Sequence, residues 1–158
     1  MLSMLQPSLA ESLCEVWAIL HKDTEFRIPE SEIHYLTSMG LGSDDDVVSH
    51  LLLKKIRLAR RIDADPAQPE TVAMNSFVEY RFDGGKARFC QLVHPSAHIP
   101  SYGLSITSLE GAGLLGLAKD QMILWPNHEG KLLELHVLHV ENCPGLGEWL
   151  GAPPLPTT

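Results

Sequence analysis

The feature that most constrains the fold is a change in the spacing of apolar residues across residues 63–70. Before this stretch, apolar residues recur every three or four positions, which is the period of an amphipathic helix. After it, apolar and polar residues alternate in FVEYRF, which is the period of a half-buried strand. The stretch itself, DADPAQPE, combines two prolines with three acids. It predicts a boundary between a helical region, 1–66, and a sheet-based region, 67–146, which is followed by a tail, 147–158.

Two helices are expected first in the N-terminal region. Ser8 and Glu11 have the spacing of a capping box, and they predict a helix over 8–22. One apolar stripe follows at helical spacing, made of Leu9, Leu13, Val16 and Leu20. A second helix is expected from Pro29, which suits a first helical turn, to the glycines at 40 and 42.

The sequence GSDDDVVSHLLLKKIRLARR, residues 42–61, predicts a third helix over 46–62 with Ser43 as its N-cap. Asp44, Asp45 and Asp46 lie in its first turn, where carboxylates are favoured by about 0.3–1 kcal/mol each. Basic residues lie towards its other end, where cations are favoured. Helix capping therefore explains these charges without any further role. The short connection predicts that the second and third helices form an antiparallel arm over 29–62.

The C-terminal region predicts five strands and one short helix. The first two strands flank a hairpin turn at Asp83-Gly84-Gly85. Further strands are expected over 102–107, 121–125 and 132–140, and Ser108 is placed to cap a helix in LEGAGLLGLA. Strands with one crossing helix indicate an α+β fold. The small residues of 111–119 fit close packing of that helix better than a phosphate loop, because the order GxxxxGK[ST] is absent.

Composition excludes several classes of function. The net charge of −8 argues against a protein that coats nucleic acid, and no apolar run reaches the roughly 18 residues of a membrane span. The N-terminus has no basic segment before its apolar residues, so we expect no secretory signal. Three dispersed cysteines, at 14, 90 and 143, indicate reduced thiols in a cytoplasmic protein.

A metal or catalytic site is not expected from these residues. His136 and His139 lie three apart on a predicted strand and should face opposite sides of the sheet. His94 and His98 flank a loop, but neither has a carboxylate at a ligand spacing. No Ser-His-Asp or Cys-His arrangement follows from spacing. We expect no enzyme activity and no cofactor.

Several segments taken together resemble the C-terminal domain of GreA/GreB-type transcription elongation factors. They are VAMNSFV from residue 72, QLVHP from 91, LSITSLEGAGLLGL from 104, and Asp120. The likeness covers about residues 70–142 and is closest to the branch of the regulator of nucleoside diphosphate kinase (Rnk). The predicted arm occupies the place of that family's antiparallel coiled coil. Lys119-Asp120 departs from the family's Gly-Asp at the turn after the small helix.

The resemblance implies an FKBP-like domain without prolyl isomerase activity and a short coiled-coil arm that enters the secondary channel of bacterial RNA polymerase. It implies that Asp44, Asp45 and Asp46 form the tip that touches the channel interior. A basic helix face secures the arm in this hypothesis, made of Lys54, Lys55, Arg57 and Arg61. A solvated helix face is the alternative for those four residues.

Two alternatives to a non-enzymatic polymerase-binding regulator stay open from the sequence. One is a factor that stimulates transcript cleavage, in which the tip aspartates supply oxygen ligands to a magnesium ion of the polymerase. The other is an FKBP-like module that binds a protein unrelated to polymerase. The arm is short for the first alternative. Neither direct sequence-specific binding to nucleic acid nor membrane association is expected in any of the three cases.

Overall fold

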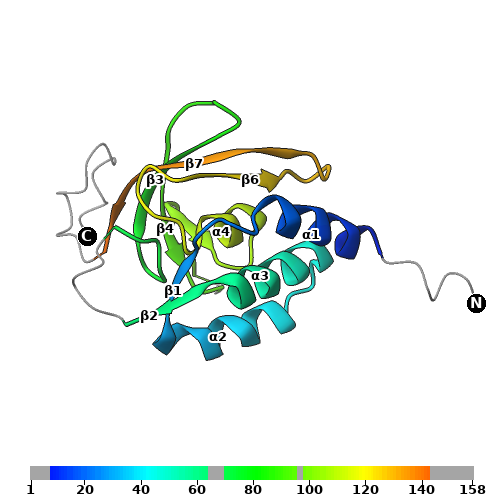
Figure 1. The fold of residues 1–158 in the computed structure, drawn as a ribbon. Helices are drawn as coiled ribbons and strands as arrows, with labels where there is room; N and C mark the ends of the chain where they lie inside the picture. Colours follow the sequence, from blue (N-terminus) through cyan, green and yellow to red (C-terminus); the bar gives the residue numbers. More distant parts are fainter. Residues whose placement is uncertain (1–7, 64–69, 96–97, 143–158) are drawn as a thin grey trace, which may run out of the picture.

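The computed structural model describes residues 8–63, 70–95 and 98–142. The N-terminal part of the chain contains three helices and two short strands, in the order α1 (Leu9–Leu20), β1 (Arg27–Pro29), α2 (Glu30–Leu41), α3 (Asp46–Leu58) and β2 (Arg60–Ile62). It continues with β3 (Phe77–Phe82), β4 (Arg88–Val93), β5 (Gly103–Ser105), α4 (Leu109–Leu114), β6 (Met122–Pro126) and β7 (Leu132–Glu141) (Figure 1). The mixture of helices and sheet confirms an α+β fold. Most of the predicted linker and all of the predicted tail lie outside the described residues.

The main sheet has five strands in the order β5-β4-β3-β7-β6. The predicted hairpin between β3 and β4 is present, and Asp83 and Gly84 both have positive φ at its turn. The pairs β4–β3, β3–β7 and β7–β6 are antiparallel, but β5 runs parallel to β4. The sheet is therefore mixed, because the chain crosses from one end of β4 to the other before β5 begins.

A register shift in the β3–β7 pair corrects the expectation for two histidines. His136 pairs with Arg81, and His139 pairs with Glu79. Glu79 and Arg81 are two apart on β3 and share a face, so His136 and His139 also share a face. Simple alternation along β7 predicts opposite faces for the two histidines. The bulge adds one residue between them and so brings both to the same face.

The short helix α4 packs closely against the sheet, as the small residues in its sequence predicted. Ser108 caps it by accepting a hydrogen bond from the Gly111 N–H at 3.0 Å. A Cβ added at Gly113 would lie 2.7 Å from Nε1 of Trp125. The glycine therefore sets how near α4 can come to β6.

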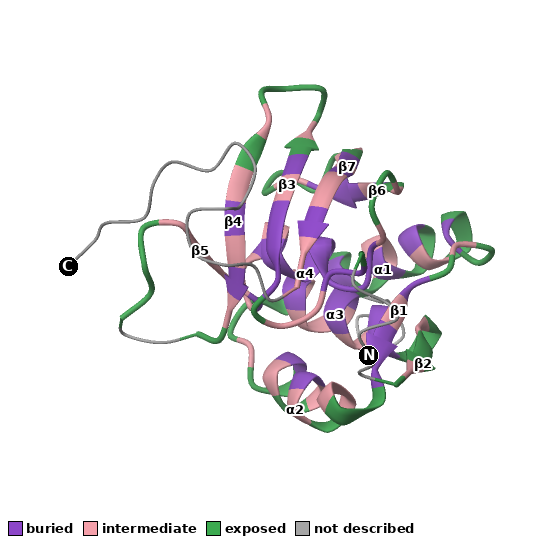
Figure 2. Ribbon diagram, turned by 90° about the vertical axis from the view of Figure 1, so that its left-hand side faces the viewer, coloured by how far each residue is buried: buried purple, intermediate pink, exposed green. Residues whose placement is uncertain are grey.

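The three N-terminal helices lie against the same core as the sheet. α3 packs against α1, α2 and α4. Buried residues from both sides of residues 63–70 form one cluster, which includes Trp17, Leu51, Ile56, Val78 and Trp125. Figure 2 shows buried stretches on β3 and β7 and an exposed outer side of α2. The predicted division into two domains stays a prediction, but the two regions share one hydrophobic cluster.

The α2–α3 pair differs from the projecting coiled coil that was expected. The two helices are joined by a short turn and pack against each other, as a hairpin requires. Val48, Leu51 and Leu52 of α3 are almost fully buried, and α3 packs against α1 and α4 as well as against α2. The hairpin is thus part of the body, and α2 forms its outer layer (Figure 1).

The ends of α3 also differ from the prediction. Asp45, and not Ser43, is the N-cap, because its carboxylate accepts hydrogen bonds from the N–H groups of Val47 and Val48 at 2.9 and 3.2 Å. The helix ends at Leu58 and not at 62, because Arg60–Ile62 leaves it as β2 and pairs in parallel with β1. A contact with a distant strand therefore overrides the helical propensity of this basic stretch.

Candidate partner-binding surface

The three aspartates of the α2–α3 turn are all exposed. Asp45 caps α3, and the Asp45 N–H donates to Oγ of Ser43 at 3.2 Å. None of the ion pairs within the described part of the chain involves Asp44, Asp45 or Asp46. The turn therefore presents uncompensated negative charge at one end of the hairpin, where a partner with basic groups can reach it.

Lys55, one of the four residues of the predicted basic face, is fully buried. Its Nζ donates hydrogen bonds to the carbonyl oxygens of Ala112, Gly113 and Leu115 at 2.9, 2.6 and 2.8 Å. These carbonyls lie at the C-terminal end of α4, where the last carbonyl oxygens of a helix have no N–H donor within the helix. The expectation that Lys55 lies on an exposed partner-binding face is wrong.

Aromatic rings complete the environment of the Lys55 ammonium. The Nζ lies 4.7 Å from the ring centroid of Trp125 and 5.2 Å from that of Phe26. Burial lowers the pKa of Lys55 well below its ordinary value, because removal from water disfavours the charged form. The carbonyl dipoles and ring faces oppose this effect by favouring the ammonium. Lys55 is thus a structural connection between α3 and α4.

The remaining predicted basic residues are at least partly exposed. Arg57 is exposed and Lys54 is half-buried. Arg61 is exposed and forms an ion pair with Glu30 at 3.3 Å between Nη1 and Oε1. The hairpin therefore offers Lys54, Arg57 and Arg61 to solvent, and one of these three already has an acidic neighbour.

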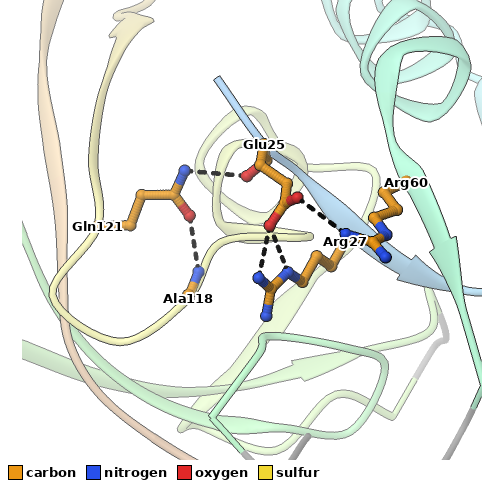
Figure 3. Close-up of polar contacts among 5 residues, drawn as sticks. All are labelled: Glu25, Arg27, Arg60, Ala118 and Gln121. Carbon is orange, nitrogen blue, oxygen red and sulfur yellow. Dashed lines mark hydrogen bonds and ion pairs between the residues drawn. The ribbon is translucent and has the colours of Figure 1, made fainter. Parts of the chain in front are cut away.

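Glu25 forms ion pairs with two more arginines, Arg27 and Arg60 (Figure 3). Its carboxylate lies 2.5 Å from Nη2 of Arg27 and 3.4 Å from Nη1 of Arg60. The hydrogen bond from Arg27, together with its charge, lowers the pKa of Glu25. The side chain of Gln121 donates to the Glu25 carbonyl at 3.1 Å and accepts from the Ala118 N–H at 2.9 Å. This network joins the β1–β2 pair to the loop between α4 and β6.

Two of the segments that carry the family resemblance, VAMNSFV and QLVHP, are joined by hydrogen bonds. Asn75 has φ of 70°, and its N–H donates to the Leu92 carbonyl at 2.7 Å. The Ser76 hydroxyl accepts from the Ala73 N–H at 2.8 Å and donates to the side chain of Asn142. These bonds join VAMNSFV to QLVHP and to the end of β7. A structural role therefore accounts for the polar residues of the first motif.

The outer helix α2 is held against this junction by two polar side chains. Oε1 of Glu32 accepts from the Met74 N–H at 3.2 Å, and the Tyr35 hydroxyl contacts Nδ1 of His94. Burial raises the pKa of Glu32. Sequence reasoning missed both contacts, because each joins residues that are far apart in the chain. Met74 and His94 lie within the segments VAMNSFV and QLVHP, so the family resemblance had marked one of the two partners in each contact.

Within the described ranges, no three His, Cys, Asp or Glu side chains gather where they could hold a metal ion. In the same ranges, no helix has both the length and the apolar character needed to cross a bilayer. Cys14 and Cys90 are buried free thiols, and burial raises the pKa of Cys90 to about 12. A thiol with so high a pKa is a poor nucleophile at neutral pH.

Comparison with known proteins found likeness at the level of structure only. No protein-family model and no curated protein matches the chain. The prokaryotic transcription elongation factor GreA/GreB from Nitrosomonas europaea matches with a TM-score of 0.59 and 25% identity, over 75% of this chain and 98% of that chain.

Two GreA factor homologs were also found among the solved structures. The protein of Thermus thermophilus has a TM-score of 0.38 and 17% identity, over 75% of this chain and 99% of its own. The protein of Thermus aquaticus has a TM-score of 0.39 and 15% identity, over 75% and 99%. Their TM-scores are too low to support an argument. The structural neighbours are thus transcription elongation factors of the GreA/GreB kind at low sequence identity, and the Rnk branch and the FKBP-like assignment stay predictions.

Proposed function

We propose that this protein binds RNA polymerase of the bacterial type and regulates transcription without being an enzyme itself. The observation that carries the proposal is the structural match to the GreA/GreB factor of Nitrosomonas europaea, which spans nearly the whole of that chain. Two of the segments that resemble the family, VAMNSFV and QLVHP, contribute to β3 and β4, which are hydrogen-bonded neighbours in the main sheet. A cytoplasmic location follows from such a partner.

The acidic turn is the contact that we propose for the polymerase. Asp44, Asp45 and Asp46 are exposed at the end of the hairpin and have no ion-pair partner in the described part of the chain. Uncompensated charge at an exposed turn steers association with a basic surface. Arg57, Lys54 and Arg61 lie further along α3 and β2 and form the second part of the surface. Entry of the hairpin into the secondary channel is the finer form of this proposal.

Equilibrium binding to purified core polymerase tests the proposal. The variant changes all three aspartates to asparagine, which removes charge but keeps a good N-cap at position 45. We expect its affinity to fall by about tenfold or more at low salt, with less effect at high salt. Asp83→Asn is the matched control, because it removes an acid from the distant β3–β4 turn, where asparagine tolerates the positive φ. Absence of wild-type binding would overturn the proposal, and equal binding by all three proteins would overturn the role of the turn.

Stimulation of transcript cleavage is the second candidate, and three exposed carboxylates on one turn favour it. Such groups are the hard oxygen ligands that magnesium prefers. It stands second because α3 is packed against α1 and α4, so the turn is not carried on an extended arm. Release of short RNAs from backtracked complexes by the wild type, but not by the triple asparagine variant, would move it to first place.

A further inference from the structure

The main sheet has an outer face, opposite to the face that packs on the core. Because side chains alternate along a strand, Phe77 and Phe89 point away from the side on which Val78 and Cys90 join the core cluster. In Figure 2, β3 and β4 lie in front of α4, which is on the core side. The ring of Tyr102, just before β5, stacks on that of Phe77 with their centroids 6.3 Å apart. Phe77, Phe89 and Tyr102 are called the aromatic patch below.

Phe77 is buried although it belongs to the outer face. It is 7% exposed, yet it lies outside the cluster of described residues that joins the helices to the sheet. Phe89 lies diagonally across from it, because Phe77 pairs with Gln91 and Glu79 pairs with Phe89. Diagonal neighbours of this kind are about 7–8 Å apart, which is within reach of aromatic side chains. The aromatic patch is therefore one continuous apolar surface.

The chain leaves the sheet beside this patch. Glu141, the last residue of β7, pairs with Phe77. Asn142 then holds the chain at this point, because its side chain donates to the Thr71 carbonyl at 3.0 Å and accepts from the Ser76 hydroxyl. The residues that follow Asn142 therefore start from a fixed position next to Phe77.

The following residues, 143–158, lie outside the described part of the chain, but their sequence suits an aromatic surface. CPGLGEWLGAPPLPTT contains four prolines, three leucines and Trp149, and its single charged side chain is Glu148. Proline-rich segments dock on aromatic surfaces at a low entropic cost, and a tryptophan ring has a large apolar area to bury. The seven residues from Asn142 to Trp149 can span about 24 Å, whereas the two strand spacings from β7 to β4 are about 10 Å.

We propose that the aromatic patch binds residues 143–158 of the same chain, with the ring of Trp149 packed against Phe77, Phe89 and Tyr102. This proposal is independent of polymerase binding. The occupant is the chain's own segment and not a second copy, because attachment at Asn142 keeps the segment near the patch at a high effective concentration. A ligand of the outer face of β3, β4 and β5 must then displace this segment.

Fluorine NMR of the full chain labelled with 5-fluorotryptophan tests the proposal. The chain has three tryptophans, and Trp149→Phe identifies the resonance of Trp149. A soluble nitroxide broadens the resonances of exposed rings, and Trp17 and Trp125, which are 0% exposed, give the value for a buried ring. We expect the broadening of Trp149 to be about fivefold weaker than in a free peptide of residues 143–158, as a docked population of about four-fifths requires.

Phe89→Ser tests the patch, because Phe89 is only partly buried and lies outside the core. The broadening of Trp149 should then rise towards the value of the free peptide, and Tyr102→Ser is a second, independent version of this test. Met122→Ser is the matched control, since Met122 is 53% exposed on β6, at the other edge of the sheet from β5. It should leave Trp149 protected. A urea midpoint near that of the wild type shows that each variant is folded.

Three results would overturn the proposal. One is a Trp149 resonance that the nitroxide broadens as strongly in the full chain as in the peptide. Another is protection that persists in both Phe89→Ser and Tyr102→Ser, or that Met122→Ser removes equally. The third is protection that is lost on dilution of the wild type, which would assign the patch to a second copy of the chain.

Discussion

At the scale of single residues, Lys55 connects two elements that are far apart in the sequence. Its ammonium satisfies three carbonyl oxygens that end α4, and it lies over the faces of Trp125 and Phe26. A buried polar group is costly when it loses its partner, so the carbonyls depend on this one side chain. Lys54, its neighbour in the chain, is half-buried and shares none of these bonds.

Replacing Lys55 with methionine should destabilise the fold by about 2–4 kcal/mol, because it leaves several carbonyls at the end of α4 without a donor. Lys54→Met is the matched control and should change the free energy of unfolding by less than about 0.5 kcal/mol. Urea unfolding at neutral pH measures both. Equal effects of the two substitutions would show that the hydrogen bonds of Lys55 contribute little.

His21 makes stability depend on pH. Its Nδ1–H donates to the Trp17 carbonyl at 2.8 Å, which leaves Nε2 to accept from Leu124. Burial lowers the pKa of His21, so the folded protein favours the neutral ring. The stability that His21 contributes is therefore fully present above about pH 6.5, the pKa of histidine in the unfolded chain. It is lost as the pH falls towards the lowered pKa of His21 in the folded protein.

Comparison with His21→Gln separates this effect from the other histidines. The variant should have a lower urea midpoint than the wild type at pH 7.5, and the difference should shrink at about pH 5, where the wild type also loses the interaction. A difference that is constant or grows on acidification would contradict the assigned protonation state.

At the scale of elements, the position of α4 depends on glycine. A Cβ at Gly113 meets the Trp125 ring at 2.7 Å and Cδ2 of Leu135 at 2.8 Å, and both side chains are buried. Gly113→Ala should therefore destabilise the protein by about 1–3 kcal/mol through overpacking. Gly42→Ala is the comparison, because a Cβ there lies 3.4 Å from the Ser38 carbonyl and φ is −90°. In thermal unfolding, Gly113→Ala should have a lower midpoint than Gly42→Ala. A Gly113→Ala variant as stable as the wild type would show that α4 can move.

Local signals predicted several of these elements well. The Ser8 and Ser108 caps, the Asp83-Gly84 turn and the small residues of α4 each act through neighbours in the chain, and each is present. The end of α3 and the burial of Lys55 could not be found in this way. Both depend on contacts across long separations, with β1 in the first case and α4 in the second. The apolar stripe of α1 was predicted, but the helix has two such faces and the sequence does not say which is buried.

At the scale of the whole molecule, one hydrophobic cluster joins the helices to the sheet. We therefore expect one cooperative unfolding transition, and not separate transitions for 1–66 and 67–146. Far-ultraviolet circular dichroism, which follows the helices, should coincide with the change in tryptophan fluorescence contributed by the buried Trp17 and Trp125. Two separated transitions would support independent domains. For the same reason, removal of residues 1–66 is a poor test of function, since it exposes the core.

The whole molecule also carries a separation of charge that bears on its partner. The acidic turn lies at one end of the hairpin, whereas the exposed Arg57 and Arg61 lie towards the other. The sequence showed this order along the chain, but the packing of the hairpin against α1 and α4 required the structure. The proposed contact with polymerase therefore uses one end of a compact body.

Site-specific photocrosslinking to core RNA polymerase tests the central proposal most directly. A crosslinking residue at position 44 samples the acidic turn, and one at the exposed position 86 samples the distant β3–β4 hairpin. We predict crosslinks to polymerase from position 44 and few or none from position 86. Crosslinks from position 86 alone, or none from either position at saturating polymerase, would contradict the proposal.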